Sequence, residues 1–121
     1  MKGYQVKVTL DVHPRIWRRV QIPSNITFRE LALILNIAMG WEGYHLSGFR
    51  IGKNEDCIFI EKKEYKADGV LNSKKIKIDE YLLEKQKIIY IYDFGDDWKH
   101  EILLEEVLED YKNKYAQVVT Y

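Results

Sequence analysis

Apolar and polar residues alternate strictly near the start of the chain, where the apolar positions are Tyr4, Val6, Val8, Leu10 and Val12. A period of two predicts a half-buried β-strand over this stretch. His13-Pro14 interrupts the pattern, because proline has no amide hydrogen to give to a β-ladder. Residues 16–22 predict a second strand that ends at Pro23, and the short connection favours an antiparallel hairpin.

Residues 24–40 carry the start and stop signals of a helix. Thr27, followed three residues later by Glu30, forms a capping-box pattern. Gly40 is suited to end the helix because glycine readily adopts a positive φ. The predicted helix runs from residue 28 to about residue 39 and is apolar on nearly every side. Such a helix is usually covered on more than one side, here by a sheet and by either the rest of the chain or a partner subunit.

The remaining pattern predicts further strands. The predicted strand segments are 46–51, 57–60, 87–92 and 98–104, with a brief pairing at 76–78. Turns or polar connections are expected at 52–54 and 62–75, a short helix at 79–84, and either a helix or a frayed tail at 106–114. The order β-β-α-β followed by more strands predicts an α+β domain. We expect a mixed or antiparallel sheet of about five to seven strands, packed on one main helix.

The stretch from Ile88 to Ile102 predicts a hairpin around an acidic turn. A five-residue loop at 93–97 sets the strand register, with Tyr92 opposite Trp98, Tyr90 opposite His100 and Ile88 opposite Ile102. Gly95 is expected to supply the positive φ of such a loop, and aspartate side chains are expected to accept hydrogen bonds from loop amides.

Composition narrows the class of protein. The chain has 121 residues, enough for one domain over 1–121, and 46% of them are hydrophobic. Its formal net charge is +0, so the chain as a whole has no basic field for nucleic acid. One cysteine excludes an internal disulfide. No signal peptide or membrane-spanning stretch is visible, which favours a cytoplasmic protein without membrane association.

Three segments, IWRRVQIP (16–23), AMGWEGYHL (38–46) and YDFGDDWKHEI (92–102), resemble signature blocks of the plasmid pRiA4b ORF-3-like family. Its members are often described as passengers of plasmids and transposable elements. The resemblance spans residues 4 to about 108 and implies an α+β fold with a β-grasp-like front half. It implies no established activity. Many members continue into an acidic segment containing Pro, Cys and Gly, whereas this sequence stops at 117–121, so an activity that needs that segment is not expected unless the sequence is a truncated one.

The acidic hairpin loop raises the question of metal chemistry. Asp93, Asp96, Asp97 and His100, with His45 from a separate loop, carry oxygen and imidazole ligands suited to Mg, Mn or Zn. The weaker alternative is therefore a metal site formed by His45, Asp93, Asp97 and His100. However, no metal-binding spacing such as HExxH is present. His100 also shares a strand face with Trp98, which favours a hydrogen-bonded core histidine.

Arginine and tryptophan gather in the second strand. The segment RIWRR places Trp17 and Arg19 on one strand face and Arg18 on the other. An arginine beside an aromatic ring can stack on bases or hold phosphates. The alternative is a solvated strand whose arginines pair with the acidic loop around Asp93. Trp41, just after the helix, closes the end of the core or forms the wall of a pocket with Trp98.

No phosphate loop, nucleophile elbow or catalytic thiol setting is present. The sequence therefore predicts a non-catalytic binding module linked to mobile elements, without a cofactor, whose partner is a protein or a nucleic acid. Its expected surface comprises Arg15, Trp17, Arg18, Arg19, Trp41, His45, Asp93, Asp96, Asp97, Trp98 and His100. The alternative is a metal-dependent hydrolase or nuclease-like enzyme that uses the acidic loop with His45 and His100. A third interpretation is that the apolar helix serves homo-oligomerisation.

Overall fold

The computed structural model describes residues 2–43, 46–51, 56–60, 76–79, 81–82, 87–113 and 115–120. The elements follow the chain in the order β1 (Gly3–Leu10), β2 (Ile16–Pro23), α1 (Phe28–Met39), β3 (Ser47–Ile51), β4 (Asp56–Ile60), β5 (Lys87–Tyr92), β6 (Trp98–Leu108) and β7 (Gln117–Thr120). The predicted β-β-α-β front half is therefore present.

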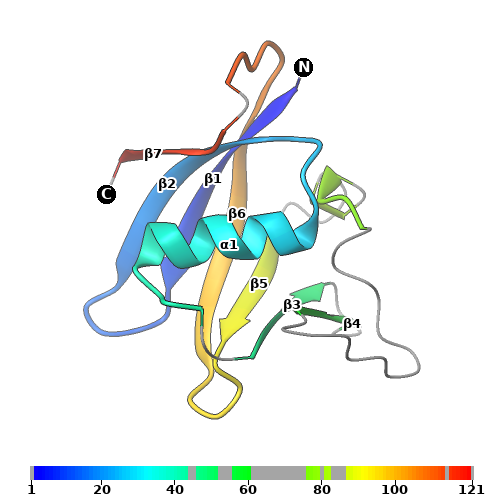
Figure 1. Cartoon of the computed structure of the whole chain (residues 1–121). Helices are drawn as coiled ribbons and strands as arrows, with labels where there is room; N and C mark the ends of the chain where they lie inside the picture. Colours follow the sequence, from blue (N-terminus) through cyan, green and yellow to red (C-terminus); the bar gives the residue numbers. More distant parts are fainter. Residues whose placement is uncertain are drawn as a thin grey trace.

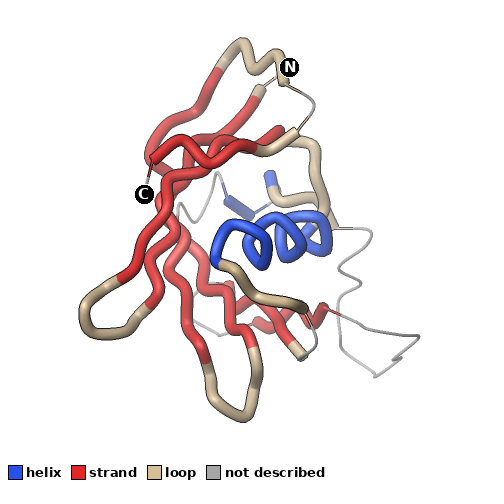
Figure 2. Tube along the Cα trace, turned by 60° about the vertical axis from the view of Figure 1, so that its left-hand side comes forward, coloured by secondary structure: helices blue, strands red, loops and turns tan. Residues whose placement is uncertain are grey.

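The strands form one seven-stranded sheet in the order β4-β3-β5-β6-β1-β2-β7, and each neighbouring pair is antiparallel. Helix α1 crosses one face of this sheet, and no described element covers the opposite face (Figures 1 and 2). We call the uncovered side the open face. The predicted α+β class, with an antiparallel sheet packed on one main helix, is confirmed.

The helix begins and ends where its capping residues predict. The side chain of Thr27 accepts a hydrogen bond from the Glu30 amide, and the Glu30 side chain accepts one from the Thr27 amide. Gly40 ends the helix at φ 81°, and its amide donates to the carbonyls of Asn36 and Ile37. Both parts of the capping prediction are confirmed.

Only one side of α1 is buried within the described structure. Phe28, Leu31, Ala32 and Leu35 are buried against the sheet. Leu33 and Ile37 are 52% and 81% exposed, so the expectation that the rest of the chain covers the far side is not met by any described residue. This exposed side borders an apolar groove of about 260 Å³, lined by Val20, Ile34, Ile37, Ala38, Tyr115, Ala116, Gln117 and Val118.

The core lies between α1 and the covered face of the sheet. Alternate residues of β1 and β2 point into it, as the period of two predicts, and their register pairs Val6 with Val20 and Tyr4 with Ile22. Phe28 of the helix packs against Phe49 of β3, with ring centroids 5.1 Å apart. Burial of these aromatic and branched side chains is the main stabilising contribution.

The β5–β6 hairpin has the predicted register. Residues 93–97 form the loop, and the opposed pairs are Tyr92 with Trp98, Tyr90 with His100 and Ile88 with Ile102. The prediction about Gly95 is wrong, because the positive φ values belong to Asp93 (63°) and Asp97 (53°). Aspartate tolerates the left-handed region better than most side chains. Gly95 instead leaves room for the Asp93 carboxylate, since a Cβ at Gly95 would lie 3.3 Å from Asp93 Oδ1.

The C-terminal part differs most from the sequence-based expectation. Residues 106–108 continue β6, so neither a helix nor a frayed tail begins at residue 106. Tyr111 then packs over β1, and a Cβ built on Gly3 would lie only 2.5 Å from Tyr111 Cγ. The Tyr111 hydroxyl lies 2.8 Å from the Tyr115 carbonyl and 3.2 Å from that of Gln21. This tyrosine joins the turn before β7 to both β1 and β2.

Some predictions fall wholly or partly outside the described residues. The turn at 52–54 and the polar stretch at 62–75 lie outside them, and so does the end of the short helix predicted at 79–84. Residues 79 and 81–82 are helical, and the brief pairing at 76–78 is seen as a bridge between Lys77 and Thr27. In the part of the chain that the structure describes, no helix is long and apolar enough to cross a membrane.

Candidate functional site

The residues selected from the sequence lie on opposite faces of the sheet. Trp98 and His100 alternate with Lys99 on β6 and point toward the helix, as does Trp41. Trp17 and Arg19 lie on the open face, where their neighbours on β1 are Thr9 and Lys7. Arg18 points to the other side of β2, and its Nη1 donates to the Trp17 carbonyl at 2.8 Å. These residues therefore belong to two separate sites, one on each face. His45 lies outside the described residues.

On the helix side, the indole of Trp41 is the centre of an aromatic cluster. Its ring stacks on Tyr92 at a centroid distance of 4.9 Å and an interplanar angle of 19°. Trp98 lies 5.6 Å away and His100 6.0 Å away, the latter edge-on. Trp41 follows α1 directly, whereas its three neighbours come from the β5–β6 hairpin. The cluster therefore closes the core at the end where the helix stops.

His100 is completely buried in this cluster, with an exposed fraction of 0%. Its Nε2 accepts a hydrogen bond from Trp41 Nε1 at 2.9 Å, and its Nδ1 lies 3.1 Å from the Tyr90 carbonyl. A carbonyl oxygen only accepts, so Nδ1 carries the proton and the ring is neutral. Burial lowers the pKa of His100 because it disfavours the charged ring. Both ring nitrogens are thus engaged within the protein, which assigns this histidine a structural role.

Two tyrosine hydroxyls attach the same end of the helix to β5. Tyr90 donates to Asn36 Oδ1 at 2.6 Å, and burial raises the pKa of Tyr90 to about 12. The amide of Gly43 donates to the Tyr92 hydroxyl at 3.0 Å. Buried polar groups are costly without partners. These bonds make the contact between helix and hairpin specific in orientation.

The acidic loop uses its polar groups to make its own turn. Asp93 Oδ1 accepts from the Gly95 amide at 3.0 Å, and the Asp97 amide donates to the Asp93 carbonyl at 2.6 Å. Asp96 and Asp97 are exposed. Among the described residues, no group of three or more His, Cys, Asp or Glu side chains is placed to hold one metal ion. The loop geometry is that of a connector between two strands.

The open face carries a tryptophan flanked by cations. Lys7 Nζ lies 4.9 Å from the centroid of the Trp17 ring, and Arg19 Cζ lies 5.4 Å from it. Both distances are within the range of cation–π attraction. Trp17 is half-buried, and these two cations lie over its ring.

Arg19 also forms a bidentate ion pair with Glu105 of β6. Its Nε and Nη2 donate to the two carboxylate oxygens at 2.6 Å and 3.0 Å. Hydrogen bonding to Arg19 lowers the pKa of Glu105, and the same bond raises the pKa of Arg19. The prediction that the arginines pair with the acidic loop is therefore wrong for Arg19. A β-bulge explains the change of partner: Gln5 pairs with Glu106 and Val6 with Leu104, so Glu105 is the extra residue.

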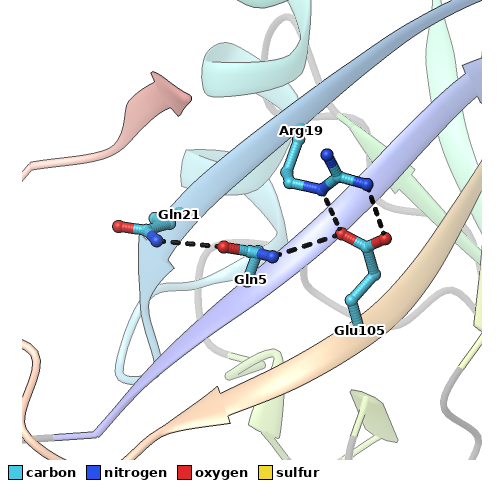
Figure 3. A network of polar contacts seen from close by, with 4 residues as sticks. All are labelled: Gln5, Arg19, Gln21 and Glu105. Carbon is cyan, nitrogen blue, oxygen red and sulfur yellow. Dashed lines mark hydrogen bonds and ion pairs between the residues drawn. The ribbon is translucent and has the colours of Figure 1, made fainter. Parts of the chain in front are cut away.

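The same carboxylate ends a row of side-chain amides that crosses four strands. Gln117 donates to Gln21 at 2.8 Å, Gln21 donates to Gln5 at 3.0 Å, and Gln5 donates to Glu105 at 3.4 Å. Figure 3 shows three members of this row, Glu105, Gln5 and Gln21, together with Arg19. The row joins β7, β2, β1 and β6 on the open face, and Gln5 gives the Glu105 carboxylate one further hydrogen bond beside those from Arg19.

A shallow depression of about 320 Å³ lies beside Trp17 on the open face. Its lining residues are Lys7, Thr9, Asp11, Arg15, Ile89, Lys99, Glu101 and Leu103. Glu101 is held by Lys87, whose Nζ lies 3.3 Å from its carboxylate. Asp11 therefore shares the depression with three cations, and the charge balance at this place is positive although the whole chain has a net charge of +0.

Sequence reasoning included Arg15, Trp17 and Arg19 but missed Lys7, Lys99 and Glu105 of the open face. The alternation along residues 4–12 already placed Lys7 on the wet side of its strand. What it did not contain was the order of strands, which sets β6 beside β1 and so lets Lys99 and Lys7 line one depression. The bulge that turns Glu105 toward Arg19 left no pattern in the sequence.

Comparison with known proteins gives a consistent result. The chain is 36% identical over 104 residues to an uncharacterized protein, y4hQ, of Sinorhizobium fredii, and the match covers 84% of this chain and 52% of that protein. The chain thus spans about half the length of this curated relative. It also resembles the crystal structure of a protein of unknown function, MM3350, from Methanosarcina mazei, with a TM-score of 0.81 and 32% identity. That match covers 98% of this chain and 68% of the other. A profile of the plasmid pRiA4b ORF-3-like proteins matches residues 2–120. The chain belongs to the plasmid pRiA4b ORF-3-like family.

Proposed function

We propose that this domain is a non-catalytic binding module that takes a partner bearing anionic groups on the open face of its sheet. The observation that carries the proposal is Trp17, whose ring has Lys7 and Arg19 within cation–π distance, on a sheet face that no described helix or strand covers. A half-buried aromatic residue among cations on a sheet surface is typical of recognition surfaces, because it combines contact area with charge.

Charge supports an anionic partner. The depression beside Trp17 brings Lys7, Arg15 and Lys99 together around Asp11, while its other acid, Glu101, is paired with Lys87. A local excess of one sign attracts the opposite sign over roughly one Debye length, about 8 Å at physiological salt. Neutral overall charge therefore does not prevent this face from attracting an anion.

The helix-side cluster supports a structural role for the other sequence-selected residues. His100 uses both ring nitrogens inside the protein, and the Asp93 carboxylate is engaged by the loop amide of Gly95. A metal-dependent hydrolase would need several such groups directed at one open point. No described feature favours that alternative over binding.

The test is a titration of the isotope-labelled domain, followed by amide chemical shifts, against four anions: a single-stranded oligonucleotide, a duplex, polyglutamate and tripolyphosphate. We expect at least one of them to shift the amides of Lys7, Trp17 and Lys99. Lys7→Gln should weaken that response, whereas Lys112→Gln should not, since Lys112 is an exposed lysine that does not line the depression. Absence of binding by all four anions, or shifts confined to the α1 side, would contradict the proposal.

A further inference from the structure

We infer that the partner of the open face is a single-stranded nucleic acid, with a base on the Trp17–Arg19 surface and an adjacent phosphate in the depression. This inference rests on the proposed function and names its ligand class. Trp17 supplies an aromatic surface, the depression supplies cations, and Lys7 belongs to both.

The base-stacking surface is already held in place. Glu105 binds Arg19 through two parallel hydrogen bonds of 2.6 Å and 3.0 Å, which fix the plane of the guanidinium group. An arginine neutralised in this way contributes little net charge to a phosphate, but its flat face remains able to stack on a base. Gln5 adds a further hydrogen bond to Glu105. The pair therefore acts together with Trp17 as a rigid platform.

The phosphate position follows from the neighbouring cations. Lys7 lies over the Trp17 ring and also lines the depression with Arg15 and Lys99. A volume of about 320 Å³ is at the lower end of the range for small-ligand sites, about 300–1,000 Å³. A sugar-phosphate unit is of that order of size. The apolar walls formed by Ile89 and Leu103 offer contact for the sugar.

Single-stranded nucleic acid uses both parts of this surface, whereas other polyanions use only one. An acidic peptide would engage the lysines but would leave Trp17 and the Arg19 plane without a stacking partner. A duplex presents its bases edge-on in the grooves, and reading them needs a protruding helix or ribbon. An open sheet with an aromatic residue instead suits unstacked bases.

The experiment measures binding of an oligothymidylate and of polyglutamate of equal charge, by tryptophan fluorescence and by anisotropy of labelled ligand. We expect the oligonucleotide to quench fluorescence and to bind more tightly than polyglutamate. Trp17→Ala should remove the quenching and weaken oligonucleotide binding by roughly tenfold, the effect of losing one base-stacking contact. Trp17→Phe should retain part of the affinity because phenylalanine still stacks.

Salt dependence provides a second readout that does not depend on Trp17. The cations of the depression predict a negative slope of log K against log salt, about −0.7 for each phosphate contact with a single strand. Lys99→Gln should reduce the magnitude of that slope by roughly 0.7, and Lys112→Gln should leave it unchanged. Circular dichroism of each variant verifies that it folds.

The outcomes separate the two proposals. Equal binding of polyglutamate, with no loss in Trp17→Ala, would overturn the nucleic-acid inference while the proposed anion-binding face stands. Binding of neither ligand would overturn the inference, and it would overturn the proposed function as well if the duplex and tripolyphosphate also fail to bind. Tighter binding of a duplex than of the single strand would also overturn the inference.

Discussion

The indole nitrogen of Trp41 donates its hydrogen to Nε2 of His100 across 2.9 Å, and this bond joins the residue that follows the helix to the middle of the sheet. His100 can accept this bond only while it is neutral, because a protonated ring carries a hydrogen on both nitrogens. The contact between helix and hairpin is therefore linked to the protonation state of one buried side chain.

The first prediction is a loss of stability on mild acidification. The pKa of His100 is lowered by burial in the folded state, so the unfolded chain, with a histidine pKa near 6.5, binds the proton first. Stability should be complete above about pH 6.5 and should fall as the pH drops through the folded pKa, by at most about 1.4 kcal/mol per pH unit. Urea unfolding at several pH values between 8 and 5 measures this change in the free energy of unfolding.

A matched pair of variants tests whether His100 causes this dependence of stability on pH. His13→Gln should keep the dependence, because His13 is exposed, whereas His100→Gln should remove it. The Glu105 carboxyl, whose pKa is lowered by Arg19, titrates below its ordinary 4.5 and so falls outside this window. Constant stability of the wild-type domain from pH 7 to pH 5 would contradict the prediction.

The second prediction concerns the hydrogen bond itself. Trp41→Phe keeps an aromatic ring on Tyr92 but removes the donor to His100, leaving a buried acceptor without a partner. We expect a loss of about 1–3 kcal/mol in the free energy of unfolding. Trp98→Phe, which makes the same truncation in the same cluster, breaks no hydrogen bond shown by the structure and should cost less. Equal losses would mean that ring size alone matters.

The third prediction concerns the backbone of the acidic loop. Asp97 has a φ of 53°, and a β-branched side chain is strained in that region. Asp97→Val should therefore cost about 1–2 kcal/mol, whereas Asp97→Gly should be neutral or slightly stabilising. Asp96→Val is the control, since Asp96 is exposed and is not among the residues with positive φ. Chemical denaturation compares the three, and similar losses for both valine variants would contradict the interpretation.

The fourth prediction tests the packing of Tyr111 on β1. A methyl group on Gly3 would lie 2.5–2.9 Å from three Tyr111 side-chain atoms, which is far inside contact distance. Gly3→Ala should destabilise the domain by about 1–3 kcal/mol. In a Tyr111→Ala background the same change should cost much less, and a double-mutant cycle measures the difference. Additive effects would show that the ring does not oppose the methyl group.

Local rules were sufficient for the parts of the fold that depend on neighbouring residues. The capping box at Thr27 and the glycine at residue 40 determine the helix ends through hydrogen bonds within a few residues. The register of the β5–β6 hairpin follows from loop length and from the alternation of its strands. These features are encoded within about 15 residues of chain.

The open face needed information that no local pattern contains. Glu105 faces Arg19 because of a bulge in β6, and β6 lies beside β1 only in the folded sheet. The four residues of β7 are too few for an alternating pattern, and Tyr111 joins that segment to the sheet through contacts far apart in sequence. The sequence identified Trp17 and Arg19 as candidates but not the lysines that accompany them.

The row of amides from Gln117 to Glu105 has one further consequence. Each of the three glutamines donates toward the carboxylate, so the row begins at Gln117 on the outermost strand and ends at the acceptor Glu105 on β6. If any single amide were rotated by 180°, two donors or two acceptors would face each other. The negative charge of Glu105 thereby sets the orientation of the amide group of Gln117, three strands away. The direction of the hydrogen bonds at the edge of the sheet is thus determined by a residue on its middle strand.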